Sequence, residues 1–556
     1  MGVSRRTLVG TAAGGSAAAA LAALGLARTA TASTALPAAS GPGDVVGKVT
    51  VGYQGWFACI GDGAPINAWW HWSANSGQAP SPSNTGIVAW PDVRDYAKTY
   101  QTGYAALGNG QPATLFSSYD QQTVDTHFQW MQQNTIDTAA LQRFNPTGGE
   151  GPTRDAMAQK VRSAAESHGR KFYIMYDVTD WTTMQSEIKA DWTNKMKAHT
   201  ASSAYARQNG KPVVCIWGFG FNDDKRPWAP APCLDVVNWF KSQGVYVIGG
   251  VPTWWRTGDR DSRAGFSDVY HAFDMISPWM VGRIGTVADA DNFYNVATVP
   301  DLAECAAHGI DYQPCVLPGA VTLRQRAHGD FMWRQFYNMV RAGVQGVYIS
   351  MFDEFNEGNQ IAKTAESQAW TPTNSGFLAL DEDGTACSSD YYLRLTGDGG
   401  KMLKGQIALT ATRPTQPVVS TGGGTGTVVA LRARANNEYV TADNAGASAL
   451  IANRTTVGAW EQFDLLDQGG GNIALRAHAN GKIVTADNAG ASPLIANRTA
   501  VGPWETFQLV HNSNGTVSLK ALANGQYVTA ENAGAAALVA NRAAIGGWEQ
   551  FDLVTS

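Results

Sequence analysis

Residues 347–358 read Val347-Tyr348-Ile349-Ser350-Met351-Phe352-Asp353-Glu354-Phe355-Asn356-Glu357-Gly358, an apolar run that ends in three carboxylates. The run is rich in β-branched and aromatic side chains, which is typical of a strand buried on both faces. Such strands form parallel sheets, and the residues that follow them lie at the carboxyl edge, where ligands bind. This segment therefore predicts a parallel α/β fold with an acidic cluster at one edge of its sheet.

Seven similar apolar runs precede this one, with room for a helix between neighbours. The predicted strands are Val49–Phe57, Thr138–Phe144, Phe172–Val178, Val213–Gly220, Val245–Val251, Met275–Met280, Tyr312–Pro318 and Gly346–Phe352. Helical patterns are plainest at Thr153–His168 and Gly329–Ala342. Eight β/α units over about 300 residues have the size of one (β/α)8 TIM barrel, which we assign to residues 45–409. A doubly wound open sheet is the alternative, but it usually carries a glycine-rich phosphate turn that this chain lacks.

Residues 428–556 contain three copies of one sequence pattern, spaced 44 residues apart. Each copy begins with Leu431-Arg432-Ala433 or its equivalent and holds short alternating strands separated by Asn/Gly turns. Three strand-rich copies predict an all-β β-trefoil, since a propeller normally needs at least about four blades. The repeated tryptophans are predicted to lie in the trefoil core because the surrounding pattern is apolar; they are Trp460, Trp504 and Trp548.

The segments outside these two domains have distinct compositions. Residues 410–427 are rich first in Pro and Thr and then in Gly, which predicts a linker. Near the N-terminus, Ser4-Arg5-Arg6-Thr7-Leu8-Val9 precedes an Ala/Gly/Leu-rich run, and Ala30-Thr31-Ala32 offers small residues for cleavage. This pattern predicts a twin-arginine signal peptide over residues 1–32 and a secreted, extracellular protein. A permanent membrane helix is the weaker alternative because the apolar run is short.

Composition and charge limit the partners of the chain. Charged residues make up 16% of the 556 residues, and the net charge is −5. Binding to nucleic acid or to an anionic membrane would need a basic patch, so we expect neither nucleic acid nor membrane as a partner after signal cleavage. The six cysteines form no CxxC pattern and no Cys/His cluster, so structural zinc on cysteine is not predicted. Outside the cell these cysteines can pair, but their spacing assigns no pairs.

The three acids after the last strand carry the main functional prediction. Like charges this close repel, and partial burial raises the pKa of one of them. One acid can then stay protonated beside an ionised base, as glycoside hydrolysis requires of two carboxylates that flank one bond. The alternatives are that the acids bind a structural cation or cap the next helix. We predict Glu354 and Glu357 as the catalytic pair.

Polar and aromatic residues follow several other predicted strands, and aromatic rings are typical walls for a sugar cleft. In the first loop Trp70-His71-Trp72 are consecutive, although strand alternation sends neighbours to opposite faces and a core rarely holds such a run. His71 is predicted as a hydrogen-bonding wall residue rather than a base or a ligand. The alternative for the polar residues is turn and cap chemistry. The predicted substrate contacts are Tyr53, Trp56, Trp70, His71, Trp72, Asp177, Trp254, Trp255, Trp279, Asp353 and Asn356.

Three segments together resemble one known group of enzymes: Tyr53-Gln54-Gly55-Trp56-Phe57, Trp70-His71-Trp72 and residues 352–361. The chain resembles glycoside hydrolase families 71 and 99, which hold α-1,3-glucanases and endo-α-mannosidases. The family 99 pattern after strand eight is Phe-Asn-Glu-Trp-x-Glu-Gly-Thr-Gln-Ile, and both of its glutamates are matched here, as Glu354 and Glu357. The chain departs from the pattern with Phe355 in place of Trp and Asp353 in place of Asn. The C-terminal repeats resemble fascin-like β-trefoils.

The resemblance implies a retaining, endo-acting glycosidase that needs no metal and no other cofactor. Glu354 would act as a base on the substrate's own 2-hydroxyl, which attacks the anomeric carbon and gives a 1,2-anhydro sugar. Glu357 would protonate the leaving oxygen and then activate water. The implied partner is a polysaccharide or glycan, either α-mannan, a related α-linked glycan or α-1,3-glucan. Trefoils on secreted bacterial hydrolases usually resemble carbohydrate-binding modules, so carbohydrate is a candidate ligand of the trefoil, but no sugar site is assigned in it. The rival hypothesis is a non-catalytic extracellular glycan-binding protein, which would not need both glutamates.

Overall fold

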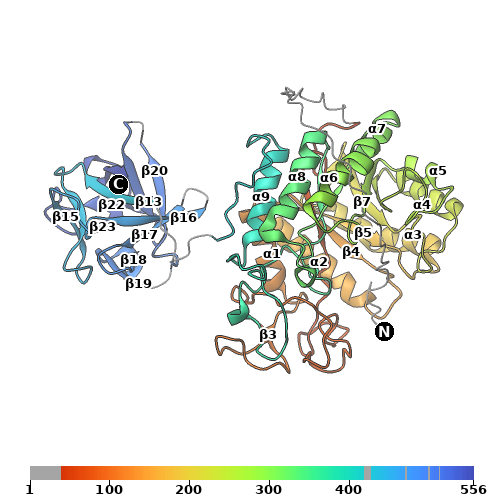
Figure 1. Ribbon diagram of the computed structural model, residues 1–556, viewed down its shortest axis with the longest axis horizontal. Helices are drawn as coiled ribbons and strands as arrows, with labels where there is room; N and C mark the ends of the chain where they lie inside the picture. Colours follow the sequence, from red (N-terminus) through yellow and green to blue (C-terminus); the bar gives the residue numbers. More distant parts are fainter. Residues whose placement is uncertain (1–38, 419–426, 470–471, 499–500, 513, 556) are drawn as a thin grey trace, which may run out of the picture. The chain divides into compact units, whose positions relative to one another are not determined.

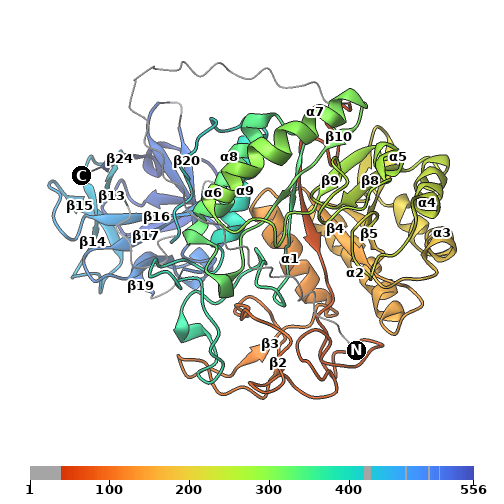
Figure 2. The ribbon, with the colours of Figure 1, turned by 45° about the vertical axis from the view of Figure 1, so that its right-hand side comes forward.

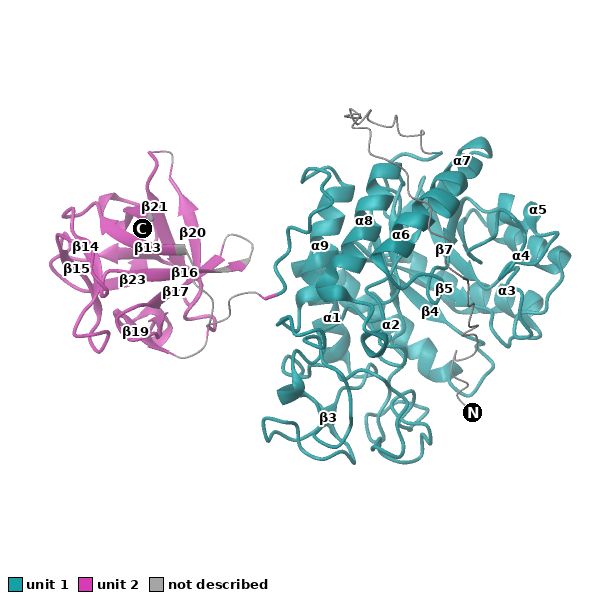
Figure 3. Ribbon diagram, in the orientation of Figure 1, with its two compact units in different colours: residues 1–417 teal, residues 418–556 magenta. Residues whose placement is uncertain are grey.

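The computed structural model describes residues 39–418, 427–469, 472–498, 501–512 and 514–555. The chain divides into two compact units, residues 1–417 and residues 418–556 (Figure 3). The predicted twin-arginine segment, residues 1–32, lies outside the described residues. Among the helices of the described ranges, none is long and apolar enough to cross a membrane.

The first unit is a parallel sheet that curls into a barrel. Its strands follow one another in the order β10-β9-β8-β7-β5-β4-β1-β12-β11. Strand β10 pairs with β9, whereas β11 pairs with β12, so one short stretch of chain joins the two edges of the sheet. The strands are β1 (Val49–Tyr53), β4 (Thr138–Arg143), β5 (Lys171–Asp177), β7 (Lys211–Trp217), β8 (Tyr246–Val251), β9 (Met275–Pro278), β10 (Asp311–Tyr312), β11 (Cys315–Val316) and β12 (Val347–Ile349).

This closure confirms the predicted (β/α)8 barrel and is incompatible with an open, doubly wound sheet. All eight predicted runs contain a barrel strand, with β10 and β11 sharing the seventh. The register brings Val49 opposite Val347, so the first and last strands of the barrel are neighbours. The strand side chains are buried on both faces, as in β4, where all six residues are buried. Because the strands are parallel, all of their carboxyl ends open onto one rim.

At least one helix follows each barrel strand position and packs outside the sheet (Figures 1 and 2). The two plainest predicted helices are present as α2 and α8. In α2, Pro152 stands in the first turn, where its missing N–H costs nothing, and Gly169 ends the helix with a φ of 60°. The helices are α1 (Gln121–Gln133), α2 (Gly151–His168), α3 (Met184–Asn194), α4 (Pro230–Ser242), α5 (Ser267–His271), α6 (Val287–Phe293), α7 (Val299–Ala307), α8 (Asp330–Ala342) and α9 (Tyr391–Leu403). Short strands β2 (Tyr100–Gln101), β3 (Thr114–Leu115) and β6 (Arg207–Gln208) lie in the connections.

The second unit has four strands in each sequence repeat and forms the predicted β-trefoil. Six strands, β13, β16, β17, β20, β21 and β24, pair antiparallel around a ring that β13 and β24 close. Each repeat adds one hairpin, β14–β15, β18–β19 or β22–β23. The strands are β13 (Thr427–Ala433), β14 (Tyr439–Ala442), β15 (Leu450–Arg454), β16 (Phe463–Gly469), β17 (Asn472–Ala477), β18 (Ile483–Ala486), β19 (Leu494–Arg498), β20 (Phe507–His511), β21 (Val517–Ala521), β22 (Tyr527–Ala530), β23 (Leu538–Arg542) and β24 (Phe551–Thr555).

The trefoil core differs from the prediction in one respect. The repeated phenylalanines Phe463, Phe507 and Phe551 are fully buried. The tryptophans three residues before them were predicted to share that core, but Trp460, Trp504 and Trp548 are 38–39% exposed. Each tryptophan stands in the turn before its strand rather than in the strand, so its side chain does not follow the strand alternation. The prediction of a tryptophan core was therefore wrong.

The first half of the predicted linker is bound to the barrel unit. The indole N–H of Trp333 donates to the carbonyl of Thr410 at 3.1 Å, and the hydroxyl of Thr415 donates to Asp398 at 2.7 Å. Arg394 donates to the carbonyl of Gln416 at 2.9 Å. Residues 410–417 thus follow the surface of α8 and α9 as an ordered part of the first unit. Residues 419–426, which hold the glycine run, lie outside the described residues.

All six cysteines lie within the described residues, and all six are buried as free thiols. Burial raises the pKa of each thiol, to about 12 for Cys233, Cys315 and Cys387. A thiol with so high a pKa is a poor nucleophile and a poor metal ligand at neutral pH. The cysteines therefore act as small apolar residues of the barrel unit.

Candidate active site

The acidic segment after β12 folds back on the end of that strand. The amides of Ile361 and Ala362 both donate to the carbonyl of Phe352, at 3.1 Å and 2.8 Å. Between these contacts the chain makes one helical turn, in which the amide of Gly358 donates to the carbonyl of Glu354 at 3.0 Å. Residues three apart on such a turn have Cβ atoms about 5–6 Å apart. The turn therefore carries Glu354 and Glu357, three residues apart, at the carboxyl rim of the barrel.

Glu354 is the more enclosed of the two glutamates, with only 2% of its surface exposed. Its Oε2 accepts a hydrogen bond from Nε2 of Gln54, which follows β1 directly. Because β1 and β12 are neighbours in the barrel, this bond links the ends of the first and last strands. A carboxylate that accepts an amide hydrogen bond is held in one orientation, as a base acting on a fixed substrate atom needs.

Glu357 has the opposite environment. Its side chain is partly exposed, and it makes no hydrogen bond or ion pair with any described residue. A carboxyl group at a partly open rim can exchange protons with solvent and with a bound ligand. The two glutamates thus differ as two carboxylates with separate proton-transfer roles should.

Asp353 fixes the acidic segment to the end of β1 through two hydrogen bonds. Its Oδ1 accepts from the amide of Gln54 at 2.7 Å, and its Oδ2 accepts from the amide of Gly55 at 2.8 Å. It has no exposed surface, and this burial raises its pKa from 3.8 to about 6, although the two amide bonds act in the other direction. Asp353 was predicted as a substrate contact, but both of its oxygens are engaged inside the protein. Its geometry fits a positioning role.

An aromatic wall stands beside the acidic turn. The indole of Trp56 lies between two rings, His71 at a centroid distance of 3.6 Å and Phe144 at 5.5 Å, and is nearly parallel to both. Trp70 meets His71 edge-on at 5.2 Å. All four side chains are partly exposed. Flat, partly exposed rings of this kind offer the apolar faces against which sugar rings pack.

Asn356 ties this wall to the acidic turn. Its amide nitrogen donates to the carbonyl of His71 at 2.9 Å and to the carbonyl of Gly86 at 2.7 Å. His71 has a φ of 62°, so it occupies a left-handed backbone conformation that the surrounding contacts must hold. The amide group of Asn356 is therefore used to fix the first loop, whereas the sequence predicted a contact with substrate.

A further acid, Glu150, lies beside the wall and was not predicted. It stands at the N-cap position of α2, seven residues after the end of β4, whereas the prediction considered only residues that directly follow a strand. Burial raises the pKa of its carboxyl group, and the nearby Arg154 and the indole of Trp70 lower it in part. The signal that could have found Glu150 is an acid in the connection between a barrel strand and its helix, where barrel enzymes place their chemistry.

Three buried polar atoms at this rim have no hydrogen-bond partner among the described residues. They are Gln54 Oε1, Trp56 Nε1 and Asn356 Oδ1. Unsatisfied buried polar groups are costly and rare in native proteins, so each one calls for an explanation. These donors and acceptors belong to the connections that follow the neighbouring strands β1 and β12, and they are suited to a polyhydroxylated ligand.

Three predicted contacts lie inside the protein instead of at the rim. Tyr53 is fully buried, and its hydroxyl bonds to Nδ1 of His127 at 2.9 Å. Trp72 is also fully buried and donates to the carbonyl of Phe116 at 2.9 Å. Trp255 is 2% exposed and donates to Asp301 at 3.1 Å. These side chains complete the core beneath the loops, so the prediction that they contact substrate was wrong.

The remaining predicted residues lie on other parts of the same rim. Asp177 ends β5, is 1% exposed and accepts from the amide of Thr179 at 2.9 Å. Trp279 follows β9, is partly exposed and meets Trp217 edge-on at 5.4 Å. Trp254 follows β8 and lines a hollow of about 360 Å³, where Arg260 stacks on its ring at 3.8 Å. Of the thirteen residues predicted for the site, those around the acidic turn and the first loop are the ones that come together.

The parallel (β/α)8 barrel thus carries two glutamates in unlike environments on one rim, with an aromatic wall beside them. No protein-family model matches the chain, and no curated protein matches it by sequence. Solved structures do resemble it. The GH99 endo-α-mannosidase from Bacteroides thetaiotaomicron is 15% identical with a TM-score of 0.47, over 65% of this chain and 98% of that one.

Two further structures resemble the second unit. The designed threefold-symmetric protein ThreeFoil is 25% identical with a TM-score of 0.22, over 23% of this chain and 99% of that one. The BEL β-trefoil is 13% identical with a TM-score of 0.22, over 25% of this chain and 99% of that one. The solved structures similar to this chain thus include the family 99 that the strand-eight motif indicated, and they include β-trefoils.

Proposed function

We propose that this protein is a secreted glycoside hydrolase that cleaves an α-linked glycan, α-mannan or a related polysaccharide, from within the chain and with retention of configuration. The observation that carries the proposal is the pair of glutamates on one turn after β12. Glu354 is buried and held by Gln54, whereas Glu357 is partly exposed and makes no hydrogen bond with the described residues. A barrel that only bound glycan would not need two carboxylates in such contrasting environments.

Glu354 is the base and Glu357 the acid in the first step. The carboxylate of Glu354 takes the proton of the substrate's 2-hydroxyl while that oxygen attacks C1 of the same sugar. The bond from C1 to the leaving oxygen breaks, and Glu357 gives its proton to that oxygen. The products are a 1,2-anhydro sugar and the released end of the chain.

The second step restores the enzyme. The ionised Glu357 takes a proton from a water molecule, whose oxygen attacks C1. The bond between C1 and the 2-oxygen opens, and Glu354 returns its proton to that oxygen. Two inversions at C1 give overall retention. Neither step uses a metal or an organic cofactor.

The rim supplies the contacts for the sugar rings. The wall formed by Trp56, His71 and Trp70 packs against the apolar faces of the substrate, and Glu150 accepts hydrogen bonds from its hydroxyls. The hollow at Trp254 offers a place for a more distant sugar, which an enzyme that cuts within a polymer needs. The sugars and linkages preferred by this rim depend on the positions of these side chains.

The trefoil holds the enzyme on its polysaccharide. Its three exposed tryptophans are equivalent by repeat and present one apolar ring each to solvent. Repeated aromatic platforms favour a polymer, because one chain can reach more than one of them. The role of the trefoil is therefore to bind carbohydrate, and the predicted twin-arginine signal places the whole protein outside the cell.

The test is reducing-sugar release by the protein from residue 33 onward on a panel of α-mannans and α-glucans. We expect release from one class of polymer, and loss of release in Glu357→Gln by roughly a hundred-fold or more. The matched control is Glu366→Gln, because Glu366 is a partly exposed acid that pairs with Arg94 outside the acidic turn.

The configuration of the first product, followed by NMR, tests retention. Inversion would contradict the 2-hydroxyl mechanism even if the polymer is cleaved. A protein that binds one of these polymers in a pull-down but releases no sugar from any of them would support the rival function, a non-catalytic glycan-binding protein.

A further inference from the structure

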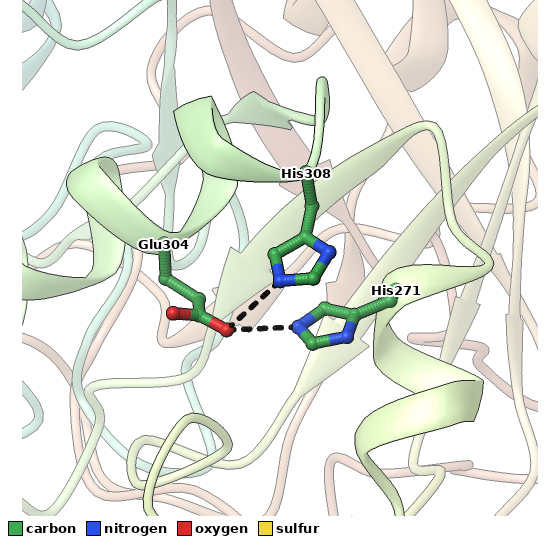
Figure 4. Close-up of side chains that lie close together, drawn as sticks. All are labelled: His271, Glu304 and His308. Atoms are coloured by element: carbon green, nitrogen blue, oxygen red, sulfur yellow. Dashed lines mark hydrogen bonds and ion pairs between the residues drawn. The ribbon is translucent and has the colours of Figure 1, made fainter.

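Two histidines and one glutamate converge on the surface of the barrel unit (Figure 4). Nε2 of His271 lies 3.0 Å from Oε1 of Glu304, and Nε2 of His308 lies 3.3 Å from the same oxygen. The two imidazole rings stack at a centroid distance of 3.6 Å with an angle of 14° between their planes. One atom from each side chain lies within 4.8 Å of the other two. We call these three residues the His/Glu cluster.

The cluster is separate from the candidate active site. His271 ends α5, four residues before β9 begins, and His308 follows α7, three residues before β10 begins. Both histidines therefore lie near the amino ends of their strands, whereas Glu354 and Glu357 follow the carboxyl end of β12. Glu304 and His308 are one helical turn apart, so α7 presents both toward α5.

The spacing of the donor atoms matches a metal site. In a tetrahedral zinc site with Zn–N and Zn–O bonds of about 2.0–2.2 Å, neighbouring donor atoms lie about 3.3 Å apart. The two nitrogen-to-oxygen distances in the cluster are 3.0 Å and 3.3 Å. Two imidazoles and one carboxylate are also the donor types that Zn²⁺ and similar transition-metal ions prefer.

The environment of the cluster also suits a metal. The side chains are 25%, 33% and 42% exposed for His271, Glu304 and His308, so an ion can enter and water can complete its coordination. The buried ring of Trp255 meets His271 edge-on at a centroid distance of 6.4 Å, so the cluster packs against the protein core. The two rings are stacked in nearly parallel planes, so one of them turns when both nitrogens bind the same ion.

We infer that the His/Glu cluster is a structural site for a divalent transition-metal ion of the zinc type. His271 Nε2, His308 Nε2 and Glu304 Oε1 are its protein ligands, and water fills the rest of the coordination shell. The bound ion cross-links α5 to α7, two short helices that flank β9. The site takes no part in the proposed hydrolysis, so its loss changes stability and leaves the chemistry at Glu354 and Glu357 intact.

Calorimetric titration of ZnCl2 into the untagged, EDTA-treated protein tests the inference. We expect one saturable site, and a rise in the melting temperature as zinc is added. His308→Ala should weaken zinc binding by roughly ten-fold or more and abolish the rise in melting temperature. His511→Ala is the matched control, because His511 is an exposed histidine of the other unit. Co²⁺ in place of zinc reports the geometry through its visible absorption.

The outcomes separate the metal site from its alternative, a hydrogen-bonded His–Glu–His group. Absence of saturable zinc binding in the unaltered protein would overturn the inference. So would equal zinc affinity in His271→Gln, His308→Ala and the unaltered protein, since the ion would then bind elsewhere. Sugar release measured on the same samples confirms that each variant is folded, because these residues lie away from the rim.

Discussion

The backbone amide of Gln54 donates a 2.7 Å hydrogen bond to Oδ1 of Asp353. The side chain of the same Gln54 donates to Glu354, the residue that follows Asp353. One residue at the end of β1 thus fixes two adjacent acids after β12, one through its backbone and one through its side chain. Asp353 sets the position of the loop, and Glu354 is presented to the rim. This division explains how two neighbouring acids can have different functions.

The titration of Asp353 predicts a pH-dependent stability. Burial raises its pKa from 3.8 to about 6, so between these pH values the folded protein holds a proton that the unfolded chain has released. The raised pKa of Asp353 therefore adds to the free energy of unfolding in full below about pH 4, and this stabilisation is lost as the pH rises through about 6. At 1.36 kcal/mol per pKa unit, this loss amounts to at most about 3 kcal/mol.

Asp353→Asn removes this titration and isolates its effect. We expect the stability difference between the unaltered protein and Asp353→Asn to shrink by up to about 3 kcal/mol from pH 4 to pH 7. Urea unfolding of the barrel, followed by tryptophan fluorescence at several pH values, measures the difference. Other titrating groups are common to both proteins and cancel. A difference that stays constant over this range would contradict the raised pKa.

Gln54→Leu tests the link between the first strand and Glu354, the proposed catalytic base. Leucine keeps most of the volume of the side chain but cannot donate to Glu354, so the carboxylate loses its fixed orientation. We expect kcat to fall by roughly a hundred-fold with little change in KM, because the positioning matters most in the reacting complex. Steady-state kinetics on whichever polymer of the α-mannan and α-glucan panel releases sugar provide the measurement.

The control for Gln54→Leu is Gln360→Leu. Gln360 is also fully buried near the acidic turn, but its side-chain amide donates to Thr364 and not to a glutamate. The control variant should lose stability without a comparable loss of kcat. If both variants lower kcat equally, the effect would come from general disruption of the loop, and the positioning role of Gln54 would be rejected.

The strands were predictable from sequence because burial on both faces leaves a continuous apolar signal. Their order in the barrel then follows from the connectivity of parallel β/α units. The acidic turn was predictable because it directly follows a strand, as in residues 350–357. For the barrel strands and the acidic turn, the local sequence pattern is therefore enough to predict the place of each residue in the fold.

The loops were not predictable in the same way, because long-range contacts decide which side chains face the rim. Trp70, His71 and Trp72 are consecutive, yet the first two belong to the wall and Trp72 is fully buried. Asn356, far away in sequence, fixes this arrangement through the carbonyl of His71. Glu150 was missed for a related reason, since its place beside Trp70 arises only when the loops after β1 and β4 meet.

Glu150→Gln tests whether this unpredicted acid contacts substrate. Glutamine has nearly the same shape but carries no charge, so it accepts weaker hydrogen bonds from sugar hydroxyls. We expect KM to rise roughly ten-fold, since a hydrogen bond to a charged group contributes more than one to a neutral group. Glu187→Gln is a matched control, because Glu187 accepts from the indole of Trp181 at 2.6 Å but belongs to α3. An unchanged KM in Glu150→Gln would remove Glu150 from the substrate site.

The exposed tryptophans of the trefoil give the last prediction. Trp460, Trp504 and Trp548 are equally exposed, so each repeat presents the same aromatic ring to solvent. If several weak sites share one polymer, removal of one tryptophan should lower the apparent affinity only modestly. Removal of all three should lower it by roughly a hundred-fold or more, which is the gain that multivalency provides. Binding to insoluble α-mannan and α-glucan should be compared for the single and triple Trp→Ala variants.

The Glu357→Gln background prevents hydrolysis during the assay. Val457 is an equally exposed apolar residue of the first repeat, so Val457→Ala controls for the loss of apolar surface alone. Retention of full binding by the triple variant would show that the trefoil does not bind glycan through these rings, and would leave the barrel rim as the part of the protein that recognises the polymer.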